Sequence, residues 1–189
     1  HTYAKGDDQY PVNAPGFIAR GEGCHVWDLD GNEYIEYGMG LRSVTLGHAY
    51  PPVVEAARRQ MLLGTNFTRP TPIEVDCAEA IHDLIGSAEM VKFAKNGSDA
   101  TTAAVKIARA YTGRYGVVKF EGHYHGVNDT VGYSHWPELD KAGPPQAPRP
   151  VPDSAGIPPA NDKLISLLPF NDTEAFARCL RENGDSLAA

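Results

Sequence analysis

The stretch Lys95-Asn96-Gly97-Ser98-Asp99-Ala100 lies between an apolar run and a helix-forming run. Residues 90–94 are Met-Val-Lys-Phe-Ala, which predicts a strand, and the alanine-rich residues 101–111 predict a helix. A small-residue turn at this junction directs backbone N–H groups and the positive end of the helix dipole at one point, which favours a phosphate. Ser98 and Asp99 are also ordinary helix-capping residues, so the hexapeptide alone leaves a purely structural role open.

A second predicted strand, residues 116–120, follows that helix and leads into Glu121-Gly122-His123-Tyr124-His125-Gly126. A strand, a helix and a strand in this order predict a right-handed βαβ unit, whose two strand ends open on the same edge of the sheet. Residues 97–98 are therefore expected to face residues 124–125 across one crevice. An anion-binding turn beside an aromatic ring and an imidazole suits a flat, phosphorylated heteroaromatic ligand. The alternatives are a packing role for Tyr124 and solvent exposure for both histidines.

The segment from residue 93 to residue 126 resembles class III pyridoxal-phosphate-dependent aminotransferases, and among them glutamate-1-semialdehyde aminomutase and its relatives. The matching motifs, which include Thr-Gly-Arg and Tyr-His-Gly, lie at residues 95–100, 108–109, 112–114, 119–122 and 124–126, with others at 27–31, 46–48, 152–158 and 171–172. The resemblance covers nearly the whole chain. It implies an α/β protein of fold type I, with an antiparallel small-lobe segment over residues 1–47. Residues 48–189 would be the first part of the cofactor-binding large domain, which is built on a mostly parallel sheet.

The resemblance also implies a cofactor, pyridoxal 5'-phosphate, and the residues that bind it. The implied cofactor-binding residues are Asn96, Gly97, Ser98, Asp99, Tyr124 and His125. Gly97 and Ser98 would hold the phosphate, and Tyr124 would stack on the ring. For the substrate carboxylate, Lys5 stands where the family carries an arginine, and Arg42 or Arg69 are the alternatives, although either can be a plain surface arginine.

No catalytic residue and no metal ligand is assigned to this chain. The family's cofactor-binding lysine, and the aspartate that holds the cofactor's ring nitrogen, match nothing in residues 1–189. We therefore expect the chain to be the N-terminal part of a longer enzyme, which the resemblance implies is a homodimer.

Three functions remain open at this point. The first is transfer of an amino group between an amine or amino acid and a carbonyl compound. The second is the intramolecular version of that reaction, which an aminomutase catalyses. The third, from another class, is a non-catalytic module that binds a phosphorylated ligand.

Charge and composition argue against some classes of binding partner. The chain has 189 residues and a net charge of −7, which argues against a nucleic-acid or anionic membrane surface. No apolar run reaches the length of a membrane-spanning helix. The three cysteines are scattered and odd in number, as is typical of a reducing compartment, so we expect a cytoplasmic protein with small-molecule substrates.

The remaining patterns predict the other elements of the fold. Residues 23–37 predict a β-hairpin that turns at Leu29-Asp30-Gly31-Asn32, followed by a glycine-containing stretch at 38–43. Helices are predicted at residues 52–63, with an apolar face, and from Thr71 to Gly86, with a capping box. The proline-rich residues 127–163 predict a mobile lid, followed by a strand at 164–168 and a helix capped by Asn171. Residues 186–189 suggest the start of another strand.

Overall fold

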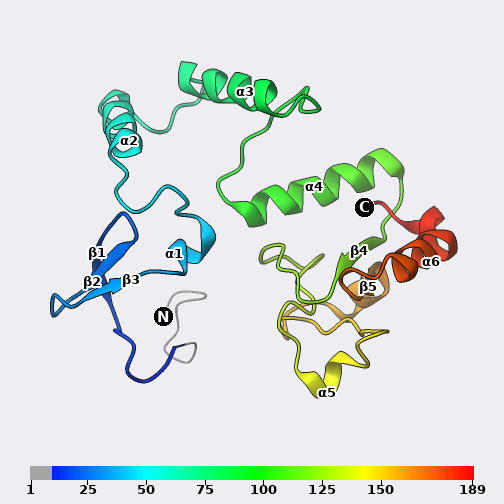
Figure 1. Cartoon of the computed structure of the whole chain (residues 1–189). Coiled ribbons are helices and arrows are strands. Elements are labelled where there is room, and N and C mark those ends of the chain that lie inside the picture. The colour runs from blue at the N-terminus through cyan, green and yellow to red at the C-terminus, as the bar shows by residue number, and fades with distance from the viewer. Residues whose placement is uncertain (1–9) are drawn as a thin grey trace. The chain divides into compact units, whose positions relative to one another are not determined.

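The computed structural model describes residues 10–189, which form two compact units divided between Ala80 and Ile81 (Figure 1). The domain boundary that the sequence suggested, between residues 47 and 48, remains a prediction. Within residues 10–189, no helix is both long and apolar enough to cross a membrane.

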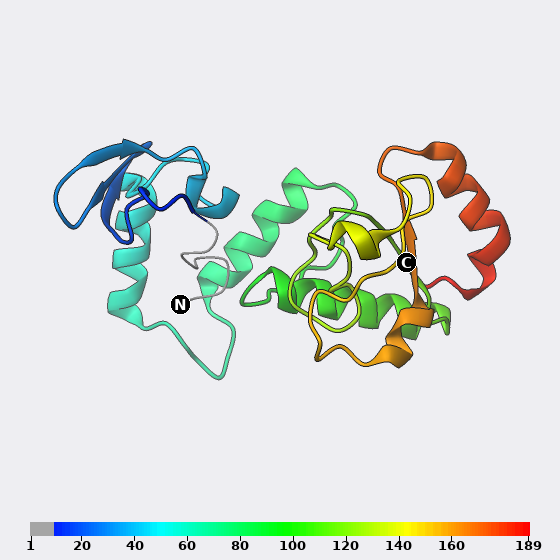
Figure 2. The same ribbon diagram turned by 90° about the horizontal axis from the view of Figure 1, so that it is seen from below.

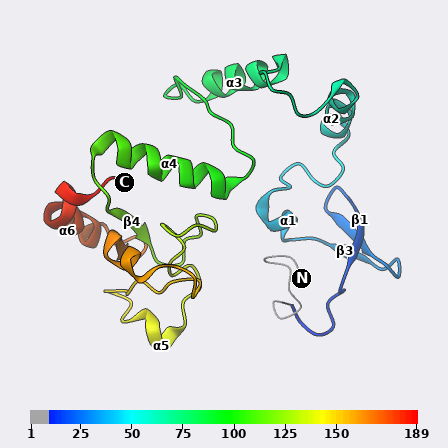
Figure 3. The same ribbon diagram turned by 180° about the vertical axis from the view of Figure 1, so that it is seen from behind.

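The first unit contains a three-stranded antiparallel sheet of β1 (Ile18–Glu22), β2 (His25–Asp28) and β3 (Glu33–Ile35). The predicted hairpin is confirmed as β2 and β3, while β1 is an additional strand. The turn forms because the Asp28 carboxylate accepts hydrogen bonds from the Asn32 backbone N–H at 2.9 Å and the Tyr34 hydroxyl at 3.0 Å. Figure 3 shows this sheet from behind.

The glycine-containing stretch after the sheet forms a single left-handed turn, α1 (Met39–Arg42). Its backbone φ angles are 47° at Met39, 57° at Gly40, 59° at Leu41 and 69° at Arg42. Left-handed conformation costs about 1–2 kcal/mol for each residue that carries a Cβ. Three of the four residues bear that cost, so the turn is locally strained.

Two predicted helices are confirmed as α2 (Pro51–Leu63) and α3 (Pro72–Leu84), of which α3 spans the division between the units. The capping box of α3 is present, because the Glu74 carboxylate accepts a hydrogen bond from the Thr71 N–H at 2.6 Å. The apolar face predicted for α2 is not buried, since Val53, Val54 and Met61 are all exposed.

The second unit is built on two parallel strands, β4 (Val117–Phe120) and β5 (Ile165–Leu168). The start of a strand predicted at residues 186–189 is present only as a single parallel bridge between Leu187 and Gly116. These residues run parallel to the other edge of β4, where Ala188 donates to the Gly116 carbonyl at 2.7 Å.

Successive side chains of β4 and β5 point to opposite faces of this sheet, and a different helix packs on each face. Val117 and Ile165 pack with Val105 of α4 (Gly97–Thr112), whereas Phe120 contacts Phe176 of α6 (Thr173–Asn183). Figure 2 shows α4 and α6 on opposite sides of β4 and β5. The second unit is therefore layered as an α/β structure, as predicted.

The strand predicted for residues 90–94 is wrong. Residues 91–94 have no regular secondary structure, and Met90 is 93% exposed. A strand needs a neighbouring ladder of hydrogen bonds, and no described strand pairs with this segment. The parallel pair is formed instead by β4 and β5, and the connection between them runs through residues 121–164.

The lid predicted for residues 127–163 is also wrong for both ends of the segment. Val131, Tyr133 and Ile157 belong to the hydrophobic core, and Tyr133 pairs with Pro152 in an antiparallel bridge. The prolines prevent long regular elements, so only α5 (Leu139–Ala142) and the 3-10 helix η2 (Pro159–Leu164) form. Mobility of the intervening residues 136–150 remains a prediction.

The predicted cap of the last helix is off by one residue. Asp172 caps α6, because its carboxylate accepts a hydrogen bond from the Ala175 N–H at 2.8 Å. Asn171 has a φ of +61° and serves the preceding turn. The short 3-10 helix η3 (Gly184–Ser186) then leads into the final residues.

This assignment predicts different outcomes for two neighbouring substitutions. Asp172→Ala should lower the free energy of unfolding by about 1 kcal/mol, because the helix loses its capping acceptor. Asn171→Gly should be neutral or slightly stabilising, because glycine tolerates a positive φ. Denaturant titration of both variants distinguishes the two caps, and a larger loss for Asn171→Gly would contradict the assignment.

Candidate functional site

The start of α4 leaves an anion-binding group of atoms open. Asn96 caps the helix by accepting a hydrogen bond from the Asp99 N–H at 2.9 Å, so Asn96 takes the capping role that the sequence left to Ser98 or Asp99. In the part of the chain that the structure describes, the N–H groups of Gly97 and Ser98 donate to no acceptor. A Cβ at Gly97 would meet no atom within 4 Å, so the space beside this residue is open.

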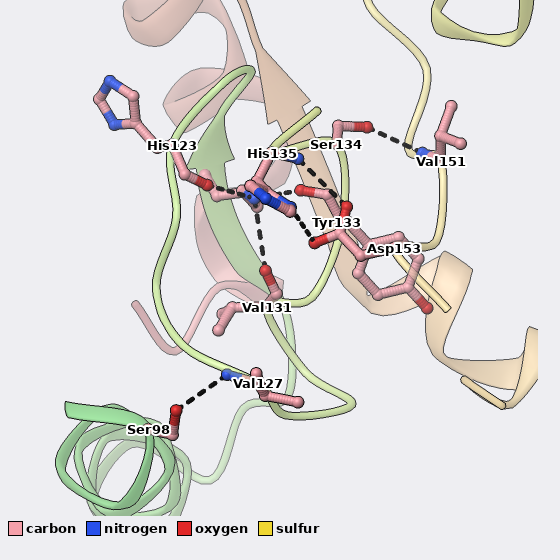
Figure 4. Close-up of polar contacts among 10 residues, drawn as sticks. Ser98, His123, Val127, Val131, Tyr133, Ser134, His135, Val151 and Asp153 are labelled. Carbon is pink, nitrogen blue, oxygen red and sulfur yellow. Dashed lines mark hydrogen bonds and ion pairs between the residues drawn. The ribbon is translucent and has the colours of Figure 1, made fainter. Parts of the chain in front are cut away.

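The loop after β4 packs directly against this helix start. The Ser98 hydroxyl accepts a hydrogen bond from the Val127 N–H at 2.9 Å, which leaves its own proton free to donate (Figure 4). Thr101 donates to the His125 carbonyl at 2.7 Å. Gly126 has a φ of +96°, and a Cβ there would lie 2.7 Å from Ser98, so only glycine permits this approach.

The Tyr124 side chain is 51% exposed at this loop. Its ring lies 5.2 Å from the His135 ring, in an edge-to-face arrangement at 60°. His135 in turn pairs with Asp153, with 3.1 Å between Nδ1 and the carboxylate oxygen. Tyr124 therefore has one side against the protein and enough free surface to contact a flat ligand.

Lys119 lies beneath the loop and is only 3% exposed. Its ammonium donates to the carbonyls of His123 at 2.9 Å and Val131 at 3.3 Å, and also to the Tyr133 carbonyl. Burial lowers the pKa of Lys119, and the carboxylate of Asp153 opposes that shift. The ammonium thus ties the loop after β4 to the segment that carries His135.

The imidazole of His125 lies in a setting that disfavours its protonation. Burial lowers the pKa of His125, and the charges of Lys119 and His123 lower it further. The side chain is half-buried, while its backbone carbonyl is held by Thr101.

This shift makes part of the stability dependent on pH. The pKa of His125 in the folded protein lies below its unfolded value of about 6.5. The unfolded chain therefore binds this proton first, so stability falls as pH drops through 6.5 towards the folded pKa. His125→Gln should reduce that loss in melting scans between pH 7.5 and 5, and the two curves should run parallel above pH 7. Equal losses on acidification would contradict the assignment.

The sequence-predicted residues are thus brought together in part. Residues 96–99 meet residues 124–127 in the second unit, whereas Arg42 is an exposed residue of the left-handed turn in the first unit. Arg69 also belongs to the first unit, and Lys5 lies outside the described residues. The sequence pointed to two turns that are in contact in the structure, and the roles of their residues remain predictions.

Sequence reasoning missed three polar residues that support this site: Lys119, His135 and Asp153. Lys119 could have been noticed, because it is the one charged residue of an otherwise apolar strand and falls on a face that is buried. His135 and Asp153 lie in irregular, proline-rich chain, where no periodicity indicates which side chains meet.

The arrangement fits a flat phosphorylated group. Two free amide donors, the Ser98 hydroxyl and the helix dipole suit a phosphate dianion, and the half-exposed Tyr124 ring suits an aromatic face. Within residues 10–189, no cluster of three or more His, Cys, Asp or Glu side chains is placed to hold a metal ion.

Comparison with known proteins identifies the group to which these features belong. The model of the family "Aminotransferase class-III" matches residues 4–178. Glutamate-1-semialdehyde 2,1-aminomutase of Sulfurihydrogenibium azorense is 39% identical over 194 residues, covering 99% of this chain and 44% of that protein.

Solved structures of transaminases are also similar to this chain. An omega-transaminase from Sphaerobacter thermophilus matches with a TM-score of 0.86 and 36% identity, covering 95% of this chain and 41% of that one. A structure described as a transaminase with PLP bound matches with a TM-score of 0.83 and 34% identity, again covering 95% and 41%. The chain therefore spans less than half the length of these relatives.

Proposed function

The chain belongs to the class-III aminotransferase family, and from this premise we propose that the protein containing it is an enzyme that uses pyridoxal phosphate to transfer amino groups. One observation carries the proposal beyond family membership. The free N–H groups at the start of α4 and the Ser98 hydroxyl adjoin the loop that presents Tyr124. A helix start and an aromatic ring in one place suit this cofactor's phosphate and ring.

Each residue at the site has a distinct task in this proposal. The N–H groups of Gly97 and Ser98 bind the phosphate, and the Ser98 hydroxyl donates a further hydrogen bond. Asn96 and Asp99 shape the helix start, since Asn96 accepts the Asp99 N–H. Tyr124 supports one face of the cofactor ring, and the adjacent residue His125 has a pKa lowered by burial. Bound there, pyridoxal phosphate supplies an electron sink for bond breaking at the substrate's amino-bearing carbon.

Arg42 is our candidate for binding a substrate carboxylate, with Lys5 as a second cation. Arg42 lies on the strained left-handed turn, and backbone strain of this kind gathers at ligand-binding sites. An arginine also offers the paired donors that match a carboxylate. The substrates would then be an amine or amino acid and a carbonyl compound.

The type of amino transfer is the open choice within this function. The relative named an aminomutase supports intramolecular transfer, whereas the structural relative named an omega-transaminase supports transfer between two molecules. We favour the second, because the structural match to the omega-transaminase is strong over 95% of the chain. A homodimer in the cytoplasm belongs to the same proposal. A non-catalytic phosphate-binding module is the remaining alternative.

The natural protein that contains residues 1–189 provides the test. Titration with pyridoxal phosphate should produce saturable near-visible absorbance. Incubation with an amine donor and a 2-oxo acid should then yield the aminated acid, detected by mass spectrometry. Conversion of glutamate-1-semialdehyde without any added donor would favour the aminomutase instead. A protein that binds the cofactor but changes neither substrate would favour the non-catalytic module, and absence of binding would overturn the proposal.

A further inference from the structure

We propose that His135 and Asp153 are positioning residues that set the orientation of the Tyr124 ring at the cofactor. This inference rests on the proposed function and adds two residues that lie outside the cofactor-binding turns. Neither residue belongs to the cofactor-binding residues 96–99 or 124–125. We therefore expect them to act on the cofactor through Tyr124, whose ring contacts His135.

The contacts form a short chain from a carboxylate to the aromatic ring. Asp153 holds His135 at two points: one carboxylate oxygen accepts the His135 backbone N–H at 3.2 Å, and the other lies 3.1 Å from Nδ1. The first contact fixes the backbone of His135, and the second sets its ring beside the carboxylate, where Nδ1 forms no hydrogen bond. The imidazole then lies 5.2 Å from the Tyr124 ring at an angle of 60°. Edge-to-face contact of this kind is a favoured arrangement of aromatic rings.

Backbone hydrogen bonds hold the chain segments next to both supporting residues. Asp153 donates its N–H to the Gly132 carbonyl at 2.9 Å, and Ser134 donates its N–H to the Val151 carbonyl at 2.8 Å. The Ser134 hydroxyl also accepts a hydrogen bond from the Val151 N–H at 2.9 Å, and Ser134 is fully buried (Figure 4). His135 and Asp153 are thus presented by two paired segments.

The same frame holds the backbone beneath Tyr124. The Gly122 N–H donates to the Ser134 carbonyl at 2.8 Å, and Lys119 bonds to the carbonyl of His123 on one side and of Tyr133 on the other. Tyr124 therefore has a fixed backbone and one fixed ring neighbour. Its ring is held in place before the cofactor arrives, which lowers the entropy cost of stacking.

A double-mutant cycle on the natural protein tests this role. His135→Ala should weaken pyridoxal phosphate binding about 3- to 10-fold, because Tyr124 loses the neighbour that holds its ring. In a Tyr124→Ala background the same substitution should have little further effect, since no ring remains to be positioned. His135→Phe should recover most of the affinity, because it restores an aromatic neighbour without the ion pair. Asp153→Ala should cause a smaller loss than His135→Ala, because the aromatic neighbour remains but its backbone loses a hydrogen-bond acceptor.

The readouts separate positioning from folding. Circular dichroism of the bound cofactor should change in His135→Ala and return in His135→Phe, while melting temperatures report the fold. His25→Ala is a matched control, because His25 also pairs with a carboxylate, Glu33 at 2.7 Å, and lies 6.2 Å from the Trp27 ring. That variant should bind the cofactor with unchanged affinity.

Two outcomes count against the inference and can be told apart. Additive losses in the His135→Ala and Tyr124→Ala cycle, or unchanged binding in His135→Ala, would overturn the positioning role alone. Failure of the wild-type protein to bind pyridoxal phosphate would overturn the proposed function and the positioning role together.

Discussion

Gly97→Val is expected to lower the affinity for pyridoxal phosphate by about 100-fold or more. The isopropyl group would occupy open space at the start of α4, where a Cβ meets no protein atom within 4 Å, and we expect it to keep a phosphate away from the two free N–H groups. Loss of two charge-assisted hydrogen bonds, at about 1.5–3 kcal/mol each, gives a change of this size. Gly97 does not need a positive φ, so the backbone tolerates valine and the fold should persist.

Gly86→Val is the matched control for this experiment. Gly86 is also exposed, its φ is not positive, and a Cβ there also meets no atom within 4 Å. Equilibrium dialysis of the natural protein and both variants against pyridoxal phosphate, with melting temperatures in parallel, separates binding from folding. Unchanged affinity in Gly97→Val would place the phosphate elsewhere.

Local signals in the sequence predicted most of the helices and strands correctly. Capping boxes, turn residues and alternation concern residues that are close in the chain, so the β2–β3 hairpin, α2, α3, β4 and β5 all followed from them. The failures concern partners that are distant in the chain. Residues 90–94 have the composition of a strand, but composition does not supply a neighbouring strand. The apolar face of α2 likewise indicates which side chains favour burial, but it does not indicate which element would bury them.

The candidate site shows the same division. Small residues before a helix indicated the turn at residues 97–98. The strand order indicated that residues 124–125 lie close to that turn, and Ser98 indeed contacts Val127. The strand order was reasoned from a βαβ unit that does not form, yet the two turns still meet, because α4 packs on β4 through Val105 and Val117. The supporting residues in irregular chain could not be predicted, because their contacts follow no period.

Lys119 is the buried residue that connects the loop carrying Tyr124 to the segment carrying His135. Its ammonium bonds to three carbonyls, from His123, Val131 and Tyr133, and the charge of the Asp153 carboxylate also favours it. Burying a charge is costly, and the three carbonyls together with the attraction of Asp153 offset that cost. The arrangement joins the loop after β4 to the core segment at residues 131–133, so loss of the ammonium should affect stability more than any other single change considered.

Lys119→Met is therefore expected to lower the free energy of unfolding by about 2–4 kcal/mol. Methionine matches the length of the lysine side chain, but it leaves three carbonyl groups without their donor at about 1–3 kcal/mol each, and removal of the buried charge returns part of this. Lys106→Met is the control, because Lys106 is exposed on α4, and it should change stability by less than about 0.5 kcal/mol. Denaturant unfolding of the natural protein measures both variants. Equal stability of Lys119→Met and wild type would mean that the ammonium only compensates for its own burial, and that packing alone holds the loop beside Tyr124.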